Sequence, residues 1–149
     1  MRRINAYKKL FNVEGTIDLK ELKTTYRGLV KQWHPDKFQE DAKKAEAEVK
    51  SQEIIDGYHF LVSISEETKQ ADLEQYKTRT TVTGIQDFQF EKQVLTITFN
   101  DGAVYEYFGV TPNVYHKMVN TDKLMRFAKR NIFTSHLYRQ SKKGALATA

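Results

Sequence analysis

Residues 26–37 read YRGLVKQWHPDK, a stretch that runs from an amphipathic segment straight into a proline-containing loop. From Leu19 to Trp33 apolar residues recur at steps of three and four, which predicts a helix with one buried face. The helix is expected to end near Trp33, because Pro35 has no amide hydrogen and disfavours helical geometry at His34.

A second long helix is predicted at about residues 40–64, since its opening EDAKKAEAEVK consists of strong helix formers with charges of both signs. Ile54, Tyr58 and Leu61 form its core-facing stripe. Two antiparallel helices joined by a short loop make a helical hairpin. Residues 7–13 are expected to add a short leading helix that packs on it.

The loop of this hairpin holds His34, Pro35 and Asp36. Proline restricts the loop, Asp36 offers a carboxylate to a partner's arginine or amides, and His34 offers a ring donor or acceptor. Such a rigid loop suits recognition, and the alternative is a turn in which Asp36 caps the next segment. The tripeptide supplies no nucleophile or oxyanion donor and the four histidines lack ligand spacing, so we expect no catalysis, no metal and no cofactor.

The helix and loop at residues 26–37 resemble the J domain of DnaJ-like co-chaperones, and the resemblance extends over roughly residues 4–64. It implies an all-α domain that binds a seventy-kilodalton heat-shock chaperone and stimulates its ATPase, with the His-Pro-Asp tripeptide as the required signature. It also implies that the basic face of the helix docks on an acidic surface through Lys23, Arg27 and Lys31. The alternative for this basic face is an ordinary solvated helix surface.

Two positions depart from the pattern of that family. Ser51 stands where the third helix usually has Phe, and Gly57 stands where Ala is usual. Glycine at position 57 is expected to cost roughly 1 kcal/mol of helix stability relative to alanine. Residues 65–76 match the last helix of the family only loosely.

The composition then changes. Residues 77–83 read KTRTTVT, which has no helical period and predicts a linker. Residues 84–140 alternate apolar and polar side chains around an Asn-Asp-Gly turn at 100–102, which predicts a small α+β domain with a three-stranded antiparallel meander and helices. The fold class is therefore α+β, with a helical domain at residues 1–76 and a disordered tail at residues 141–149.

The second domain carries LTITF at residues 95–99 and VYEYFGV at residues 104–110. In these features it resembles the KTSC domain, a module found at the end of some lysyl-tRNA synthetases and as a single-domain bacterial protein. The hallmark of that family is a Tyr-x-Tyr pair, here Tyr105 and Tyr107.

The turn at residues 100–102 decides which way the two tyrosines point. A three-residue loop places Tyr105 opposite Ile97 and Tyr107 opposite Leu95, so that both are core residues. A two-residue turn shifts the register by one residue and points both tyrosines to the other face. The first register is preferred, because it pairs aromatic with aliphatic side chains.

The net charge of +5 is unevenly spread, since residues 1–80 hold 15 basic and 14 acidic residues whereas residues 81–149 hold 9 and 5. A basic excess at one end indicates an anionic partner, unless it is only a solvated surface. Basic side chains can neutralise phosphates while an exposed aromatic ring stacks a base. The candidates for RNA contact are Lys123, Arg126, Lys129, Arg130, Tyr138 and Arg139.

The chain of 149 residues has no cysteine and no apolar run near the roughly 20 residues that cross a bilayer, so a reducing cytoplasm and no membrane partner are expected. We predict a non-enzymatic co-chaperone whose first module recruits a seventy-kilodalton heat-shock chaperone. Its second module would engage a client, RNA or a ribonucleoprotein. The alternative is an RNA-binding protein in which the helical hairpin is a scaffold or a protein contact.

Overall fold

Helix α2 begins where Asp18 caps it and ends where proline stops it. The carboxylate of Asp18 accepts a hydrogen bond from the backbone N–H of Lys20 at 2.9 Å, which satisfies one of the donors that the first helical turn leaves free. The elements around it are α1 (Arg2–Leu10), α2 (Leu19–Trp33), the 3-10 turn η1 (Pro35–Lys37), α3 (Asp41–Ile64) and α4 (Glu66–Ala71). The predicted ends of the two long helices are confirmed to within a residue.

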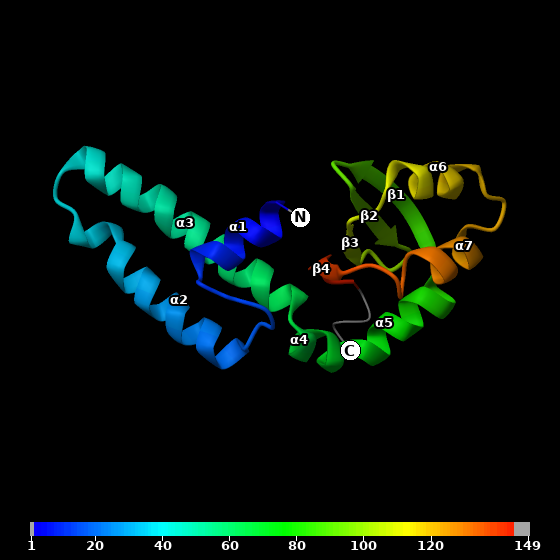
Figure 1. Ribbon diagram of the computed structural model, residues 1–149, viewed down its shortest axis with the longest axis horizontal. Helices are drawn as coiled ribbons and strands as arrows, with labels where there is room; N and C mark the ends of the chain where they lie inside the picture. Colours follow the sequence, from blue (N-terminus) through cyan, green and yellow to red (C-terminus); the bar gives the residue numbers. More distant parts are fainter. Residues whose placement is uncertain (1, 145–149) are drawn as a thin grey trace. The chain divides into compact units, whose positions relative to one another are not determined.

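The computed structural model describes residues 2–144 of the chain (Figure 1). By its contacts the chain divides into two compact units, Met1–Thr68 and Lys69–Ala149, and the division falls within α4. Each unit has its own core, so each is described by itself.

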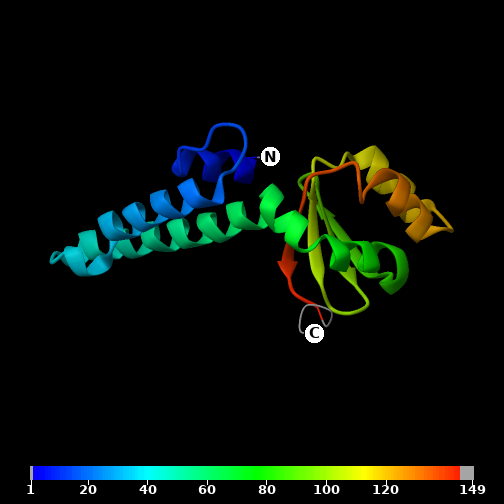
Figure 2. The ribbon, with the colours of Figure 1, turned by 90° about the horizontal axis from the view of Figure 1, so that it is seen from below.

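In the first unit, α2 and α3 lie side by side as an antiparallel hairpin (Figure 2). The rings of Tyr26 in α2 and Tyr58 in α3 stack with their centroids 4.1 Å apart. Leu22, Ile54 and Leu61 are almost completely buried between the helices. Burial of these apolar side chains is the main force that holds the hairpin together.

Helix α1 packs on α3 at Gly57. An alanine methyl group at this position would lie 2.8 Å from Cδ1 of Tyr7 and 3.0 Å from Cε2 of Phe11, closer than carbon atoms pack. The Tyr7 ring is also 5.2 Å from the ring of Phe60, centroid to centroid. The glycine that weakens α3 as a helix therefore makes room for the aromatic side chains of α1.

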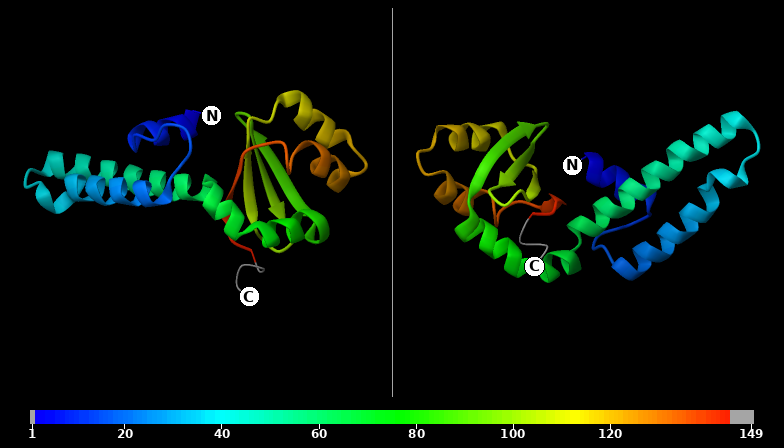
Figure 3. Two further views of the ribbon diagram at one scale, coloured as in Figure 1. Left: turned by 60° about the horizontal axis from the view of Figure 1, so that its bottom comes forward. Right: turned by 180° about the vertical axis from the view of Figure 1, so that it is seen from behind.

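The second unit is a four-stranded antiparallel sheet with helices packed on one face. Its helical elements are α5 (Leu73–Thr78), the π-helical turn η2 (Arg79–Thr83), α6 (Pro112–Asn120) and α7 (Leu124–Asn131). Its strands, in spatial order, are β1 (Ile85–Glu91), β2 (Val94–Phe99), β3 (Val104–Phe108) and β4 (Tyr138–Lys142). Figure 3 shows α6 and α7 beside the sheet from two directions. The buried cluster includes Tyr76 of α5, Met118 of α6 and Ala128 of α7 together with the inward residues of β2 and β3.

The two hallmark tyrosines are core residues. Strand β2 pairs with β3 so that Ile97 is opposite Tyr105 and Leu95 is opposite Tyr107. Tyr105 is 2% exposed and Tyr107 is fully buried. Gly102 adopts a φ of +90° at the turn, which glycine does without steric cost. The predicted three-residue loop and its register are confirmed.

Three parts of the second unit differ from the prediction. The sheet has four strands rather than three, because β4 pairs with β3, with Tyr138 opposite Tyr107. The segment predicted as a linker, residues 77–83, is helical and supplies buried side chains, since Arg79 has no exposed surface. Of the tail predicted to be disordered, Ser141 and Lys142 belong to β4, whereas residues 145–149 lie outside the described residues.

Candidate functional sites

The His-Pro-Asp loop is held where α2 gives way to η1. His34 closes α2 with an extended backbone, φ −62° and ψ 129°, and also caps η1. Pro35 occupies the first position of η1, where its missing amide hydrogen costs nothing. The proline that ends one helix thus starts the next turn, which fixes the direction of the side chains on either side of it.

The side chains of this loop face solvent. The side chain of Asp36 is 83% exposed and that of His34 is 51% exposed. Nδ1 of His34 accepts a hydrogen bond from the backbone N–H of Asp36 at 3.2 Å, which places a neutral ring's proton on Nε2. The Asp36 carboxylate lies 3.6 Å from the same nitrogen. The imidazole is therefore oriented by the backbone, and the carboxylate is available to an incoming donor.

The predicted basic face is present on α2. Lys23, Arg27 and Lys31 recur every four residues, and all three are exposed. Within residues 2–144 none of them forms an ion pair. The stripe runs along α2 toward the His-Pro-Asp loop, which directly follows the end of this helix.

Ser51 of α3 contacts the end of α2, just before the loop. Its hydroxyl donates a hydrogen bond to the backbone carbonyl of Trp33 at 2.8 Å, which satisfies one of the carbonyls that the end of α2 leaves free. The ring of Phe38 stacks on Trp33 with centroids 6.3 Å apart. Sequence reasoning treated Ser51 only as a departure from a family pattern, whereas the structure gives it a contact that joins α3 to the end of α2.

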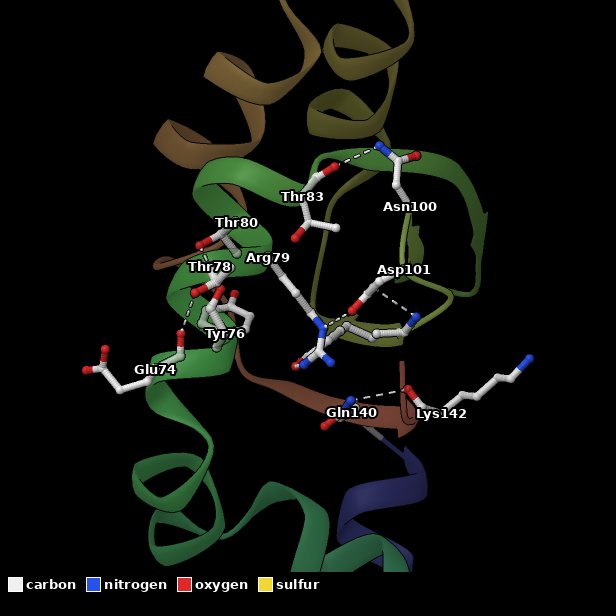
Figure 4. A network of polar contacts seen from close by, with 12 residues as sticks. Glu74, Tyr76, Thr78, Arg79, Thr80, Thr83, Asn100, Asp101, Gln140 and Lys142 are labelled. Carbon is white, nitrogen blue, oxygen red and sulfur yellow. Dashed lines mark hydrogen bonds and ion pairs between the residues drawn. The ribbon is translucent and has the colours of Figure 1, made fainter. Parts of the chain in front are cut away.

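In the second unit the hallmark tyrosines bind polar groups supplied by η2 and α5. Figure 4 shows two of the residues that supply them, Arg79 beside Asp101 and Tyr76 on α5. Nη1 of Arg79 donates to the hydroxyl of Tyr105 at 3.0 Å, and its Nε donates to the carboxylate of Asp101 at 2.9 Å. The hydroxyl of Tyr76 lies 3.0 Å from that of Tyr107 and donates to the carbonyl of Phe133 at 2.7 Å. These are long-range pairings that no local sequence pattern predicts.

Burial governs the ionisation of this network. Burial raises the pKa of Tyr76, Tyr105 and Tyr107, although the Arg79 charge acts in the opposite direction on Tyr105. Burial alone would lower the pKa of Arg79, but its hydrogen bonds and the charge of Asp101 outweigh that effect and raise it. Arg79 is therefore a buried cation paired with an anion, and its Nη2 atom is buried without a hydrogen-bond partner among the described residues.

The structure brings together four of the six residues predicted to contact RNA. Lys123 precedes α7, and Arg126, Lys129 and Arg130 lie on it, with all four exposed. A shallow hollow of about 350 Å³ lies against this helix. It is lined by Thr121, Asp122, Lys123, Arg126, Phe127, Arg130 and Asn131.

The other two predicted RNA contacts, Tyr138 and Arg139, lie on β4 and contact other side chains of the second unit. The ring of Tyr138 stacks on Tyr76 with centroids 4.2 Å apart and planes 7° apart, and the ammonium group of Lys69 lies over it at 4.6 Å. The guanidinium of Arg139 forms an ion pair with the carboxylate of Glu106. The Tyr138 ring and the Arg139 guanidinium thus both have partners among the described residues.

The described part of the chain holds no group of three or more His, Asp or Glu side chains placed to bind a metal ion. Within the same residues, no helix combines the length and the apolar character that a membrane span requires.

Comparison with protein families assigns both halves of the chain. The family model for the DnaJ domain matches residues 5–72, and the family model for the KTSC domain matches residues 83–136. No match was found among curated proteins or among solved structures. The matches thus assign a DnaJ domain to the N-terminal part of the chain, which includes the His-Pro-Asp loop. A KTSC domain follows it.

Proposed function

We propose that this protein is a co-chaperone whose J domain binds a seventy-kilodalton heat-shock chaperone and stimulates its ATPase. J domains generally partner with chaperones of that class. The observation that supports the proposal here is the exposed His34-Pro35-Asp36 loop, which lies at the end of the helix that carries Lys23, Arg27 and Lys31. Charged groups so arranged speed encounter and fix the orientation of a partner with an acidic surface.

In this proposal the chain has no catalytic activity of its own, because hydrolysis takes place on the chaperone. The Asp36 carboxylate, 83% exposed, would accept hydrogen bonds from the partner, and the rigid proline would hold it in place. The KTSC domain would engage the client. The rival proposal, an RNA-binding protein in which the hairpin is only a scaffold, predicts no stimulation at all.

The test is the ATPase rate of a purified seventy-kilodalton heat-shock chaperone with and without the full chain. Asp36→Asn removes the negative charge and keeps the shape, and we expect it to abolish stimulation. Asp41→Asn is the matched control, because Asp41 is also exposed, lies in the first turn of α3 and undergoes the same chemical change. Thermal unfolding of both variants should match the parent within about 0.5 kcal/mol, as is usual for surface substitutions. Equal stimulation by Asp36→Asn and the parent would overturn the proposal.

A further inference from the structure

Helix α7 and the residue before it carry a block of positive charge, next to which lies one carboxylate, Asp122. Of the eight residues from 123 to 130, four are basic, and the sequence has no acidic residue after Asp122. Lys123, Arg126 and Arg130 are exposed, and in the described residues they have no ion-pair partner. Cations that the protein itself leaves without counter-charges attract an anionic partner and release bound counterions when they meet it.

The surface beside these cations is concave and contains an aromatic ring. Arg126 and Arg130 are one helical turn apart on the same side of α7, and both line the hollow of about 350 Å³. Phe127 lines the same hollow while its inner side packs against the core of the unit, so the ring is fixed but partly accessible. The side-chain amide of Asn131 donates to the carbonyl of Phe127 at 3.0 Å, so its own carbonyl oxygen remains an acceptor.

We propose that this hollow is a binding site for single-stranded nucleic acid. The cations Lys123, Arg126 and Arg130 would neutralise successive phosphates. Phe127 would stack on an unpaired base, a contact worth about 1–3 kcal/mol. Lys129, exposed on the same helix but outside the hollow, would add to the attraction without making a specific contact.

Two features favour single-stranded nucleic acid over an anionic membrane and over a nucleic-acid duplex. A helix that lies on an anionic membrane needs an exposed apolar face, and the large hydrophobic residues exposed in the described part of the chain, Val49, Val82 and Val119, are all outside α7. A duplex hides its bases, so an accessible ring in a hollow selects for an unstacked base. The site therefore suits a flexible single strand of nucleic acid, which presents both phosphates and unstacked bases.

The experiment measures fluorescence anisotropy of a labelled, unstructured uridine-rich RNA with the full chain. We expect Arg126→Gln/Arg130→Gln to weaken binding by about tenfold. Lys44→Gln/Lys92→Gln removes the same two charges from exposed positions elsewhere and should leave binding within about twofold of the parent. Three phosphate contacts predict a slope of log K against log salt of about −2.1, falling to about −0.7 in the Arg126/Arg130 variant.

Further arms of the same titration identify the ligand. Phe127→Leu should weaken binding by at least about fivefold whereas Phe127→Tyr should retain it, because only an aromatic ring can stack. A DNA strand of the same sequence should bind through the same residues, and the two affinities show which strand is preferred. Absence of RNA binding by the parent, an equal loss in the Lys44/Lys92 control, or equal affinity for polyglutamate or duplex would overturn the proposal. Its outcome is independent of ATPase stimulation, which is measured without RNA.

Discussion

The hydroxyl oxygens of Tyr76 and Tyr107 lie 3.0 Å apart inside the second unit. A phenol has a single hydrogen, and Tyr76 gives its own to the carbonyl of Phe133, so Tyr107 is the donor to Tyr76. Tyr76 precedes the residues that match the KTSC family, 83–136, and nevertheless completes the hydrogen bonding of the second hallmark tyrosine. The folded second domain therefore includes α5.

Tyr76→Phe tests that statement. The change leaves the hydroxyl of Tyr107 without an acceptor and the carbonyl of Phe133 without a donor, both in buried surroundings. We expect the free energy of unfolding of the second unit to fall by about 2 kcal/mol. Tyr58→Phe is the control, because within the described residues the hydroxyl of Tyr58 has no hydrogen bond, and it should change stability by less than about 0.5 kcal/mol.

Two probes separate the units in that measurement. Trp33 is the only tryptophan of the chain, so its fluorescence during urea unfolding reports the first unit. Far-ultraviolet circular dichroism follows both units. A shift in the tryptophan transition for Tyr76→Phe, with none in the remaining signal, would contradict the assignment of Tyr76 to the second core.

Alkaline pH should unfold the second unit before the phenols of its core ionise. The folded pKa values of Tyr76, Tyr105 and Tyr107 are raised above the ordinary tyrosine value near 10, chiefly by burial. Below about pH 10 these phenols are protonated in both the folded and the unfolded chain, so the free energy of unfolding has its full value. As pH rises from there toward the folded pKa, only the unfolded chain releases the protons, and the free energy of unfolding falls. At about pH 11 Tyr76, whose folded pKa is raised far above the ordinary value, should cost about 1.4 kcal/mol, and Tyr105 and Tyr107 should lower stability in the same direction.

Phenolate absorbance and circular dichroism, recorded together, check this expectation. Three of the eight tyrosines should remain protonated until the structure is lost, and then ionise in the same transition. Ionisation of all eight near pH 10 with the fold intact would show that the network is open to solvent.

Alanine at the two helical glycines of the first unit should have opposite effects. Gly57→Ala adds a methyl group 2.8 Å from the ring of Tyr7, and we expect a loss of about 1–3 kcal/mol despite the better helix propensity of alanine. Gly28→Ala meets no atom within 4 Å and should stabilise α2 by about 0.5–1 kcal/mol. Urea unfolding followed by Trp33 fluorescence measures both, and stabilisation by Gly57→Ala would mean that α1 does not pack on α3 as described.

The basic face of α2 should matter most at low salt. Arg27→Glu reverses an exposed charge in the middle of this face, and we expect about a tenfold rise in the concentration needed for half-maximal ATPase stimulation. The difference from the parent should shrink as salt is raised, because screening weakens exposed charges. Lys44→Glu, the same kind of reversal on α3, is the control, and an equal effect of the two would indicate attraction without a defined docking face.

The sequence was informative where a residue acts on its own neighbours. Pro35 ends α2 whatever surrounds it, Asp18 caps the helix from the adjacent position, and Gly102 sets the turn that fixes the register of Tyr105. These effects are local, so periodicity and turn chemistry predicted them correctly. The basic stripe at Lys23 was found for the same reason.

Features that depend on distant partners were missed. Strand β4 reads YRQSK, which lacks apolar alternation, because its place is decided by the free edge of β3 rather than by its own pattern. Arg79 stands in a threonine-rich stretch typical of a linker, yet its guanidinium is buried against Asp101. The sequence did offer one signal. Tyr105 and Tyr107 were predicted to be buried, and buried tyrosine hydroxyls need hydrogen-bond partners.

The eleven residues from Leu73 to Thr83 have a practical consequence for protein engineering. A KTSC module transplanted from residue 84 onward would carry Tyr105 and Tyr107 but leave behind Arg79 and Tyr76. The two phenols would then lose these hydrogen-bond partners, and the carboxylate of Asp101 would lose its ion pair with Arg79. A transplant that starts at Leu73 would keep all of them.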